Sequence, residues 1–475
     1  MNRDGASPER RIIAVSNRVA TPSEGDKAAG GLSVGVLSAL RSNGGIWFGW
    51  NGKLTPGDTH APEVEQHDNI RFVGIDLNES DYEGYYNGFS NKVLWPLFHY
   101  LLNFIQYRRT DFDAYLRVNA TFARKLLPLI EDDDVIWVHD YHLIPLASEL
   151  RKADVGVPIG FFLHVPFPGF DVLQALPDRN YLLRSMCAYD VLGFHTARDL
   201  ASFREAVTQP EVGARIDDER QLSVADRTLH ADVYPIGIDV DGLIAFATES
   251  QNESEVTRTA RSLDGRQFII GVDRLDYSKG LEQRFRSYER LLEKYPETRG
   301  AVSYTQLAPP TRVGVRAYDE IRASLEQTSG EINGRFATLD WVPIKYINRG
   351  INRRALMGLF RLADVGLVTP IRDGMNLVAK EFVASQDPDD PGVLVLSTLA
   401  GAAHELRDAV LVNPYDADEV ADGINRALRM PLAERRERYA RMLSVLRKND
   451  IFAWRDRFVD ALCAARKGND ARITH

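Results

Sequence analysis

The chain has 475 residues, of which 44% are hydrophobic and 26% charged, so it is long enough for two globular domains and is neither disordered nor fibrous. Its formal net charge of −9 excludes a general nucleic-acid-binding or anionic-membrane-binding surface. Only two cysteines are present, and neither a signal peptide nor an apolar run of membrane-spanning length is visible, so a cytoplasmic protein without a disulfide framework is expected.

The first predicted strand, residues 12–15, is followed by the polar residues 16–18 and by a loop that ends in Gly30 and Gly31. Apolar residues then recur at helical spacing over 32–40. A glycine-bearing loop between a strand and a helix is compatible with a mononucleotide or a sugar diphosphate. The glycine spacing matches neither the dinucleotide fingerprint nor the P-loop.

Two short motifs point to other chemistries. Gly31, Ser33 and Gly35 match the nucleophile elbow of hydrolases, but no strand leads into Ser33, so a small residue in a helix is the better interpretation. The run His-Asp-Tyr-His at 139–142 contains metal-ligand types without a third ligand cluster, so polar groups lining a cleft are preferred over a metal site.

Aromatic residues and glycines gather between Trp47 and Trp95 with weak periodicity, including Tyr82, Tyr85 and Tyr86. Such a cluster is more often core or loop packing than a surface that stacks on sugars, although aromatic rings do stack on apolar sugar faces.

Three apolar runs, 135–138, 159–163 and 190–194, read as buried strands, and each ends in a histidine: His139, His164 and His195. Segments with helical spacing separate them: 143–152, 178–189 and 198–207. This alternation predicts a parallel, doubly wound sheet that presents polar side chains along one edge.

The first half of the chain is expected to end soon after these strands. Residues 208–227 read as a surface excursion, 231–238 as the last strand of this half, and the polar segment 250–264 as the boundary region.

A second series of strands begins at 268–272 and runs into a loop that carries Arg274 and Lys279 before a helix over 281–295. Two cations at one strand end can neutralise a diphosphate, and arginine binds phosphate through two parallel hydrogen bonds. We therefore prefer this interpretation over a solvated surface pair.

The stretch 369–381 follows an apolar strand at 364–368. Its turn at Asp373 and Gly374 precedes a helix whose first N–H groups and positive dipole end favour an anion. Glu381 lies one to two turns into that helix, where its carboxylate can accept hydrogen bonds from a pair of hydroxyls.

The remaining predicted elements complete two Rossmann-like, doubly wound halves that face each other across a cleft. They are strands at 301–306, 393–396 and 409–413 and helices at 313–326, 354–363, 416–430, 432–447 and 451–465. Cations and a helix N-terminus that hold a diphosphate need no metal or cofactor to help it leave, so glycosyl transfer from a nucleotide sugar is predicted.

The sequence resembles the trehalose-6-phosphate synthase family over residues 12–459. The motifs that carry the resemblance are SNR at 16–18, GGL at 30–32, FSNKVLWPLFHY at 89–100, WVHDYHL at 137–143, FFLHVPFP at 161–168, RLDYSKG at 274–280 and RDGMNLVAKE at 372–381. The resemblance implies a GT-B fold and the synthesis of α,α-trehalose 6-phosphate from UDP-glucose and glucose 6-phosphate with retention, by front-face substitution without a protein nucleophile.

The resemblance also implies roles for individual residues. The catalytic set is His164, Arg274, Lys279 and Asp373. The donor-binding set is Gly30, Gly31, Arg274, Lys279, Ile351, Asp373, Gly374, Met375, Asn376, Leu377, Val378, Ala379, Lys380 and Glu381. The acceptor-binding set is Arg18, Tyr86, Trp95, Asp140 and Arg312. Ile351 matches a uridine-contacting position that is aromatic in a bacterial relative, so the choice between UDP and GDP stays open.

The expected domains are 1–240 for the acceptor, 241–450 for the nucleotide sugar, and a C-terminal helix at 451–475 that packs back on the first domain. A homo-oligomer is expected, with no nucleic-acid or membrane partner. Two alternatives remain: a synthase for another phosphorylated acceptor such as glycerol 3-phosphate, because Arg18 and Arg312 suit either phosphate, and a catalytically silent sugar-phosphate sensor.

Overall fold

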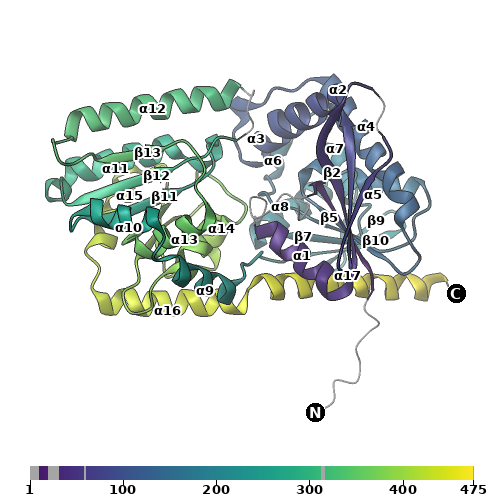
Figure 1. Cartoon of the computed structure of the whole chain (residues 1–475). Helices are drawn as coiled ribbons and strands as arrows, with labels where there is room; N and C mark the ends of the chain where they lie inside the picture. The colour runs from purple at the N-terminus through teal and green to yellow at the C-terminus, as the bar shows by residue number, and fades with distance from the viewer. Residues whose placement is uncertain (1–9, 20–30, 58–59, 312–315, 474–475) are drawn as a thin grey trace, which may run out of the picture. The chain divides into compact units, whose positions relative to one another are not determined.

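The computed structural model describes residues 10–19, 31–57, 60–311 and 316–473. The chain divides into two compact units, one formed by residues up to Ile236 together with those from Ile451 onward, the other by Gly237–Asp450 (Figure 1). Each unit contains its own, mostly parallel sheet with helices packed on it, which confirms the predicted α/β class with two Rossmann-like halves.

The sheet of the first unit has ten strands among the described residues. In spatial order they are β3 (Glu63–His67), β4 (Ile70–Asn78), β2 (Gly45–Thr55), β1 (Ile12–Arg18), β5 (Val135–His139), β6 (Ile159–Phe162), β7 (Val191–Phe194), β10 (Arg227–Val233), β9 (Gln221–Val224) and β8 (Arg215–Ile216). The pairings from β4 to β10 are parallel, and the strand order reverses between β1 and β5. This reversal is a topological switch point, where open α/β sheets bind ligands.

In the described part of the second unit the sheet has six strands, all parallel. Their order is β13 (Ile344–Ile347), β12 (Val302–Leu307), β11 (Gln267–Val272), β14 (Val365–Val368), β15 (Val393–Ser397) and β16 (Val410–Val412). Here the order reverses between β11 and β14, which places the second switch point between the two strands whose exits carry the predicted phosphate-binding residues.

Helices connect and cover these strands. Those of the first unit are α1 (Gly31–Asn43), α2 (Glu79–Tyr82), the π-helix η2 (Glu83–Leu94), α3 (Trp95–Phe98), η3 (Leu102–Phe104), α4 (Arg109–Leu126), η4 (Leu127–Leu129), η5 (Tyr141–Leu143), α5 (Leu146–Lys152), α6 (Phe170–Leu173), α7 (Arg179–Met186), α8 (Ala197–Val207) and α17 (Ile451–Ile473). Those of the second unit are α9 (Val240–Ser250), α10 (Ser254–Leu263), η6 (Tyr277–Lys279), α11 (Leu281–Lys294), η7 (Pro296–Thr298), α12 (Arg316–Phe336), α13 (Arg353–Leu362), α14 (Leu377–Ser385), η8 (Gly401–His404), α15 (Ala417–Leu428) and α16 (Leu432–Lys448).

Helices pack on both faces of each sheet because the central strands carry apolar side chains on both faces. In the second unit, Val365 and Leu367 of β14 belong to the core shared with α11 and α15. On the opposite face, Gly366 lies against the ring of Phe382 from α14, at a position where a Cβ atom would come within 2.7 Å of that ring. In the first unit, Gly160 and Gly193 make room in the same way for Phe458 of α17.

Several expectations from the sequence were wrong. Strands β2, β3 and β4 were missed because their tryptophans, glycines and charged residues show no clear period of two. The segment 250–264 contains helix α10 and lies inside the second unit, so it is not a boundary. The excursion at 208–227 is mostly exposed, as expected, and carries the short strands β8 and β9. Asp134, which directly precedes β5, is buried and pairs with Arg11 at 2.7 Å.

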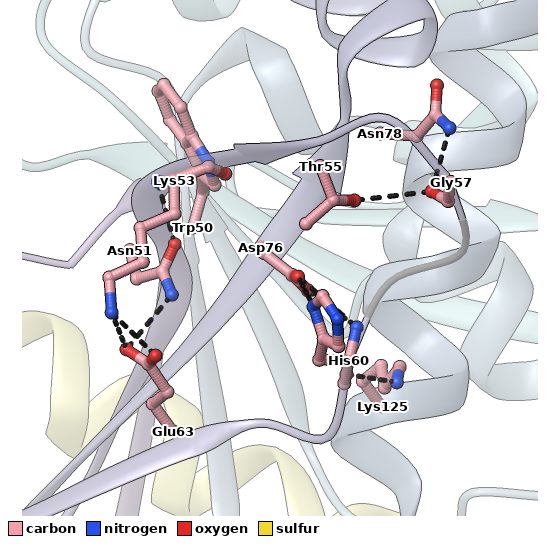
Figure 2. A network of polar contacts seen from close by, with 10 residues as sticks. All are labelled: Trp50, Asn51, Lys53, Thr55, Gly57, His60, Glu63, Asp76, Asn78 and Lys125. Carbon is pink, nitrogen blue, oxygen red and sulfur yellow. Dashed lines mark hydrogen bonds and ion pairs between the residues drawn. The ribbon is translucent and has the colours of Figure 1, made fainter.

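A polar network fixes the chain around β2, β3 and β4 (Figure 2). Lys53 of β2 pairs with Glu63 of β3 at 2.6 Å, and Asp76 of β4 accepts hydrogen bonds from the backbone N–H of His60 at 3.0 Å and 3.2 Å. Trp50 donates from Nε1 to the backbone oxygen of Lys53 at 2.8 Å, within the part of β2 where its register with β4 is irregular.

Within the described ranges, no helix is both long enough and apolar enough to cross a membrane.

Candidate functional site

In each unit, polar residues follow the two strands between which the strand order reverses. In the second unit the residues after β11 and β14 are 273–280 and 369–376, and in the first unit the exits of β1 and β5 are occupied by residues 16–18 and 139–142. Carboxyl ends of neighbouring parallel strands meet at one sheet edge, so each unit gathers its candidate residues from segments far apart in the sequence.

In the second unit, the ammonium of Lys279 lies 2.5 Å from Oδ2 of Asp373. The same carboxylate oxygen accepts a hydrogen bond from Nδ2 of Asn376 at 3.0 Å. Both partners of the ion pair are largely buried, with side chains only 10% and 13% exposed. The structure thus brings together two residues predicted for different parts of a donor, and the carboxylate holds the cation in place.

The two loops of the second unit brace each other through their backbones. The N–H of Ile371 donates to the oxygen of Ser278 at 3.0 Å. Gly280 has a φ of 63°, and a Cβ atom there would lie 2.9 Å from the backbone oxygen of Thr369, so this close approach requires glycine.

Arg284 of α11 lies beneath these loops and is completely buried. It pairs with Asp273 at 2.7 Å and donates to Gln306 and to the hydroxyl of Thr369, both at 3.0 Å. Burial raises the pKa of Asp273, and the positive charge of Arg284 opposes that rise. Sequence reasoning missed Arg284 because an arginine on an amphipathic helix ordinarily faces solvent.

Helix α14 begins beside the Lys279–Asp373 pair. Its N-cap, Asn376, has a φ of 69° and accepts the N–H of Ala379 on its side chain at 3.1 Å. The N–H groups of Leu377 and Val378 belong to the first turn, where a helix offers no carbonyl of its own. Gly374 and Met375, directly before the N-cap, are buried. An anion at this end of α14 could accept hydrogen bonds from the backbone N–H groups of the first turn.

Two charged residues of α14 have different surroundings. Lys380 is fully buried and pairs with Glu405 at 2.6 Å, so its ammonium is a structural partner, and only its backbone remains a candidate ligand. Glu381 lies 3.5 Å from Arg353 with its side chain 15% exposed. Burial raises the pKa of Glu381, and Arg353 opposes the rise.

The other predicted donor residues are placed as follows. Arg274 is exposed on the loop after β11, and Ile351 is half-buried directly before the N-cap of α13. Gly31 is the first residue of α1 in the first unit. Gly30 and the predicted acceptor residue Arg312 lie outside the described residues.

Aromatic rings dominate the exits of the first sheet. The guanidinium of Arg18 lies 5.8 Å from the ring centre of Trp50. Tyr86 is stacked on Tyr82 and on His142, with ring centres 5.3 Å and 5.7 Å apart. The cluster interpreted from the sequence as core packing therefore supplies both core and a half-buried stack beside Arg18.

Trp95 is only 6% exposed and packs on His99 and Tyr141, so most of its ring belongs to the core. Asp140, at the exit of β5, has a φ of 75° and accepts the backbone N–H of His164 on Oδ1 at 3.2 Å. This contact ties the exits of β5 and β6 together.

His164 is half-buried, and its Nε2 lies 3.2 Å from Nδ1 of the buried His139. Burial lowers the pKa of both imidazoles well below the usual value, and each is lowered further by a neighbouring histidine. Both rings are therefore neutral near pH 7. Among the residues that the structure describes, no group of three or more histidine, cysteine or acidic side chains is arranged to hold a metal ion.

Two Rossmann-like units, each built on a mostly parallel sheet, are the architecture of the GT-B class of transferases. A family model described as glycosyltransferase family 20 matches residues 9–464. The chain belongs to this family.

Similar proteins cover nearly the whole chain. A trehalose-6-phosphate synthase of Klebsiella pneumoniae is 51% identical over 95% of both chains. A UDP-forming α,α-trehalose-phosphate synthase of Burkholderia xenovorans in complex with glucose-6-phosphate is 51% identical, covers 95% of this chain and 99% of its own, and has a TM-score of 0.92. A trehalose-6-phosphate synthase of E. coli bound with UDP-2-fluoro glucose is 48% identical over 95% of this chain and 98% of its own, with a TM-score of 0.91.

Proposed function

We propose that the chain is a retaining glucosyltransferase that moves glucose from UDP-glucose to glucose 6-phosphate and releases α,α-trehalose 6-phosphate and UDP. The observation that carries this proposal is the Lys279–Asp373 pair at the start of α14, in a chain that is 51% identical to a trehalose-6-phosphate synthase over 95% of its length. The ligands of the similar structures, glucose-6-phosphate and UDP-2-fluoro glucose, support the two substrates.

On the donor side, Lys279 and Arg274 bind the diphosphate together with the first N–H groups of α14. Lys279 is already fixed by Asp373, so little reorganisation is needed when the phosphates arrive. Glu381 accepts hydrogen bonds from the ribose hydroxyls, which suits a carboxylate that is buried and only loosely paired with Arg353 at 3.5 Å. Asp373 and His164 contact the transferred glucose.

On the acceptor side, Arg18 and Arg312 bind the phosphate of glucose 6-phosphate, and Tyr86 adds its hydroxyl. Asp140 accepts a hydrogen bond from a sugar hydroxyl. Trp95, which packs on His99 and Tyr141, lies against the sugar ring.

The reaction proceeds on the front face of the donor sugar. The bond between the anomeric carbon and the leaving phosphate oxygen breaks while the acceptor hydroxyl forms the new bond. The proton of that hydroxyl passes to the leaving phosphate, whose negative charge Lys279 and Arg274 stabilise. No protein nucleophile takes part. We place the enzyme in the cytoplasm as a homo-oligomer.

The test is incubation of the purified chain with UDP-glucose and glucose 6-phosphate in the presence of a metal chelator, followed by NMR identification of the sugar product. We expect α,α-trehalose 6-phosphate, formed at the same rate with and without chelator. Parallel reactions with glycerol 3-phosphate, with GDP-glucose and without acceptor separate other acceptors, other donors and simple hydrolysis. Absence of a phosphorylated disaccharide would disprove the proposed function.

A further inference from the structure

His139 and His164 form a hydrogen-bonded pair at the exits of two neighbouring strands. His139 is the last residue of β5, where it lies opposite Phe162 of β6, and His164 follows two residues after Phe162. The distance of 3.2 Å between Nδ1 of His139 and Nε2 of His164 is that of a hydrogen bond.

Only one proton can lie between these two nitrogens. Each neutral imidazole has one N–H donor and one bare nitrogen that accepts, so one ring donates and the other accepts. The direction of this hydrogen bond therefore decides which nitrogen of His164 carries the proton.

The surroundings of His139 determine the direction. His139 is 1% exposed, and its ring lies against Trp137 and Trp454, with centres 4.6 Å and 6.4 Å away. Its Nε2 is buried and has no hydrogen-bond partner among the described residues. An N–H at this position would be an unsatisfied buried donor, which proteins avoid more strictly than an unused acceptor.

We infer that His139 is a positioning residue that sets the tautomer of His164. The Nδ1–H of His139 donates to Nε2 of His164, and His164 therefore carries its own proton on Nδ1. The ring of His164 packs against Phe162, His195 and Trp454, whose ring centres lie 4.6 Å, 5.8 Å and 6.2 Å away.

The inference rests on the proposed function for its consequence. His164 presents Nδ1–H as a fixed donor to a hydroxyl or ring oxygen of the transferred sugar, and this nitrogen has no lone pair with which to remove a proton. His164 then takes no part in proton transfer, which leaves the leaving phosphate as the acceptor of the proton.

The tautomer is measured on the resting chain, without substrate, by ¹⁵N NMR of histidine-labelled protein. The His164 resonances are assigned by their loss in His164→Asn. We expect the shift of a protonated nitrogen at Nδ1 and that of a bare nitrogen at Nε2. Protonation of His164 on Nε2 would overturn the inference, whatever reaction the chain catalyses.

Two substitutions of His139 test its consequence. Asparagine places an N–H near the position of Nδ1, so His139→Asn is expected to keep kcat within about threefold of the parent. Phenylalanine keeps the ring but not the donor, so His139→Phe is expected to lower kcat roughly tenfold, as the loss of one hydrogen bond does, with both KM values within about twofold.

The matched control is His230→Phe, which changes a half-buried histidine of β10 in the same unit and is expected to leave kcat unchanged. Parental kcat in His139→Phe, or an equal loss in His139→Asn and His139→Phe, contradicts the positioning role. If no disaccharide phosphate forms at all, the proposed function fails while the NMR measurement still decides the tautomer.

Discussion

The two units present their candidate residues in different chemical forms. The second unit holds charges in fixed pairs: Lys279 with Asp373 at 2.5 Å and Arg284 with Asp273 at 2.7 Å. The first unit presents stacked rings and neutral imidazoles, with Tyr86 between Tyr82 and His142.

The difference follows from what each unit is proposed to bind. A diphosphate that gains charge as it leaves requires cations that are already in position, and buried carboxylates keep such cations from reorienting. A sugar offers hydroxyls and apolar faces, which neutral donors and aromatic rings suit. Single substitutions can change one unit of this comparison at a time.

The largest effect is expected from Arg284→Met. This substitution leaves the buried carboxylate of Asp273 without its partner, and breaking a buried pair in this way costs about 3–5 kcal/mol. Urea unfolding followed by circular dichroism measures the loss. Arg286→Met, two residues along the same helix, is the control, because its side chain is 43% exposed and surface pairs contribute at most about 1 kcal/mol. Equal stability of the two variants would show that the buried network is not the stronger one.

Removal of either cation that we propose to bind the donor diphosphate is expected to reduce catalysis next most strongly. Lys279→Ala and Arg274→Ala should each cost at least ~2 kcal/mol of transition-state stabilisation, as loss of one charge-stabilising group commonly does. The measurement is kcat/KM for UDP-glucose, with Lys294→Ala on the surface of α11 as the control. Rates within about threefold of the parent would remove the residue concerned from the site.

A smaller and different effect is expected on the acceptor side. Asp140→Ala should raise the KM for glucose 6-phosphate roughly tenfold and leave the KM for UDP-glucose unchanged, because one charge-assisted hydrogen bond is lost. Asp226→Ala, in an exposed turn of the same unit, should change neither value. An unchanged KM for the acceptor in Asp140→Ala would exclude Asp140 from acceptor binding.

The smallest effect is a dependence of stability on pH at Glu381. Burial raises the pKa of this carboxyl, so the folded chain binds the proton more tightly than the unfolded chain does. As the pH rises from the ordinary glutamate pKa through the raised one, the free energy of unfolding of the parent should fall relative to that of Glu381→Gln. Urea unfolding of both proteins at several pH values across this interval checks the sign. Parallel curves would show that burial does not disfavour the charged form.

Much of the site was predictable because strand exits are visible in the sequence. Continuous apolar runs such as 135–138 and 365–368 mark strands buried on both faces, and the residues directly after them lie at the ligand-binding edge of a parallel sheet. The loops with Lys279 and Asp373 were predicted in this way, and the structure brings these two residues together.

Contacts between distant segments were not predictable by the same reasoning. Lys380 was grouped with the ligands because it lies in the motif, yet it pairs with Glu405, 25 residues further on. Asp134 is buried although the two aspartates before it are exposed, and its pairing with Arg11, 123 residues away, explains that burial. Hydrophobic periodicity predicts single helices and strands, but it does not indicate which charged residues of different elements form ion pairs.

By itself, the sequence determined the alternation of strands and helices and the residue types at the strand exits, because backbone geometry and local hydrophobic pattern decide both. Only the tertiary structure decided that Arg284 contacts the loops after β11 and β14 and that His139 lies beside His164. The physical reason is burial. A charge or an imidazole that is removed from water needs a hydrogen-bonding or charged partner, and the order of the strands and the packing of the helices determine which residue that partner is.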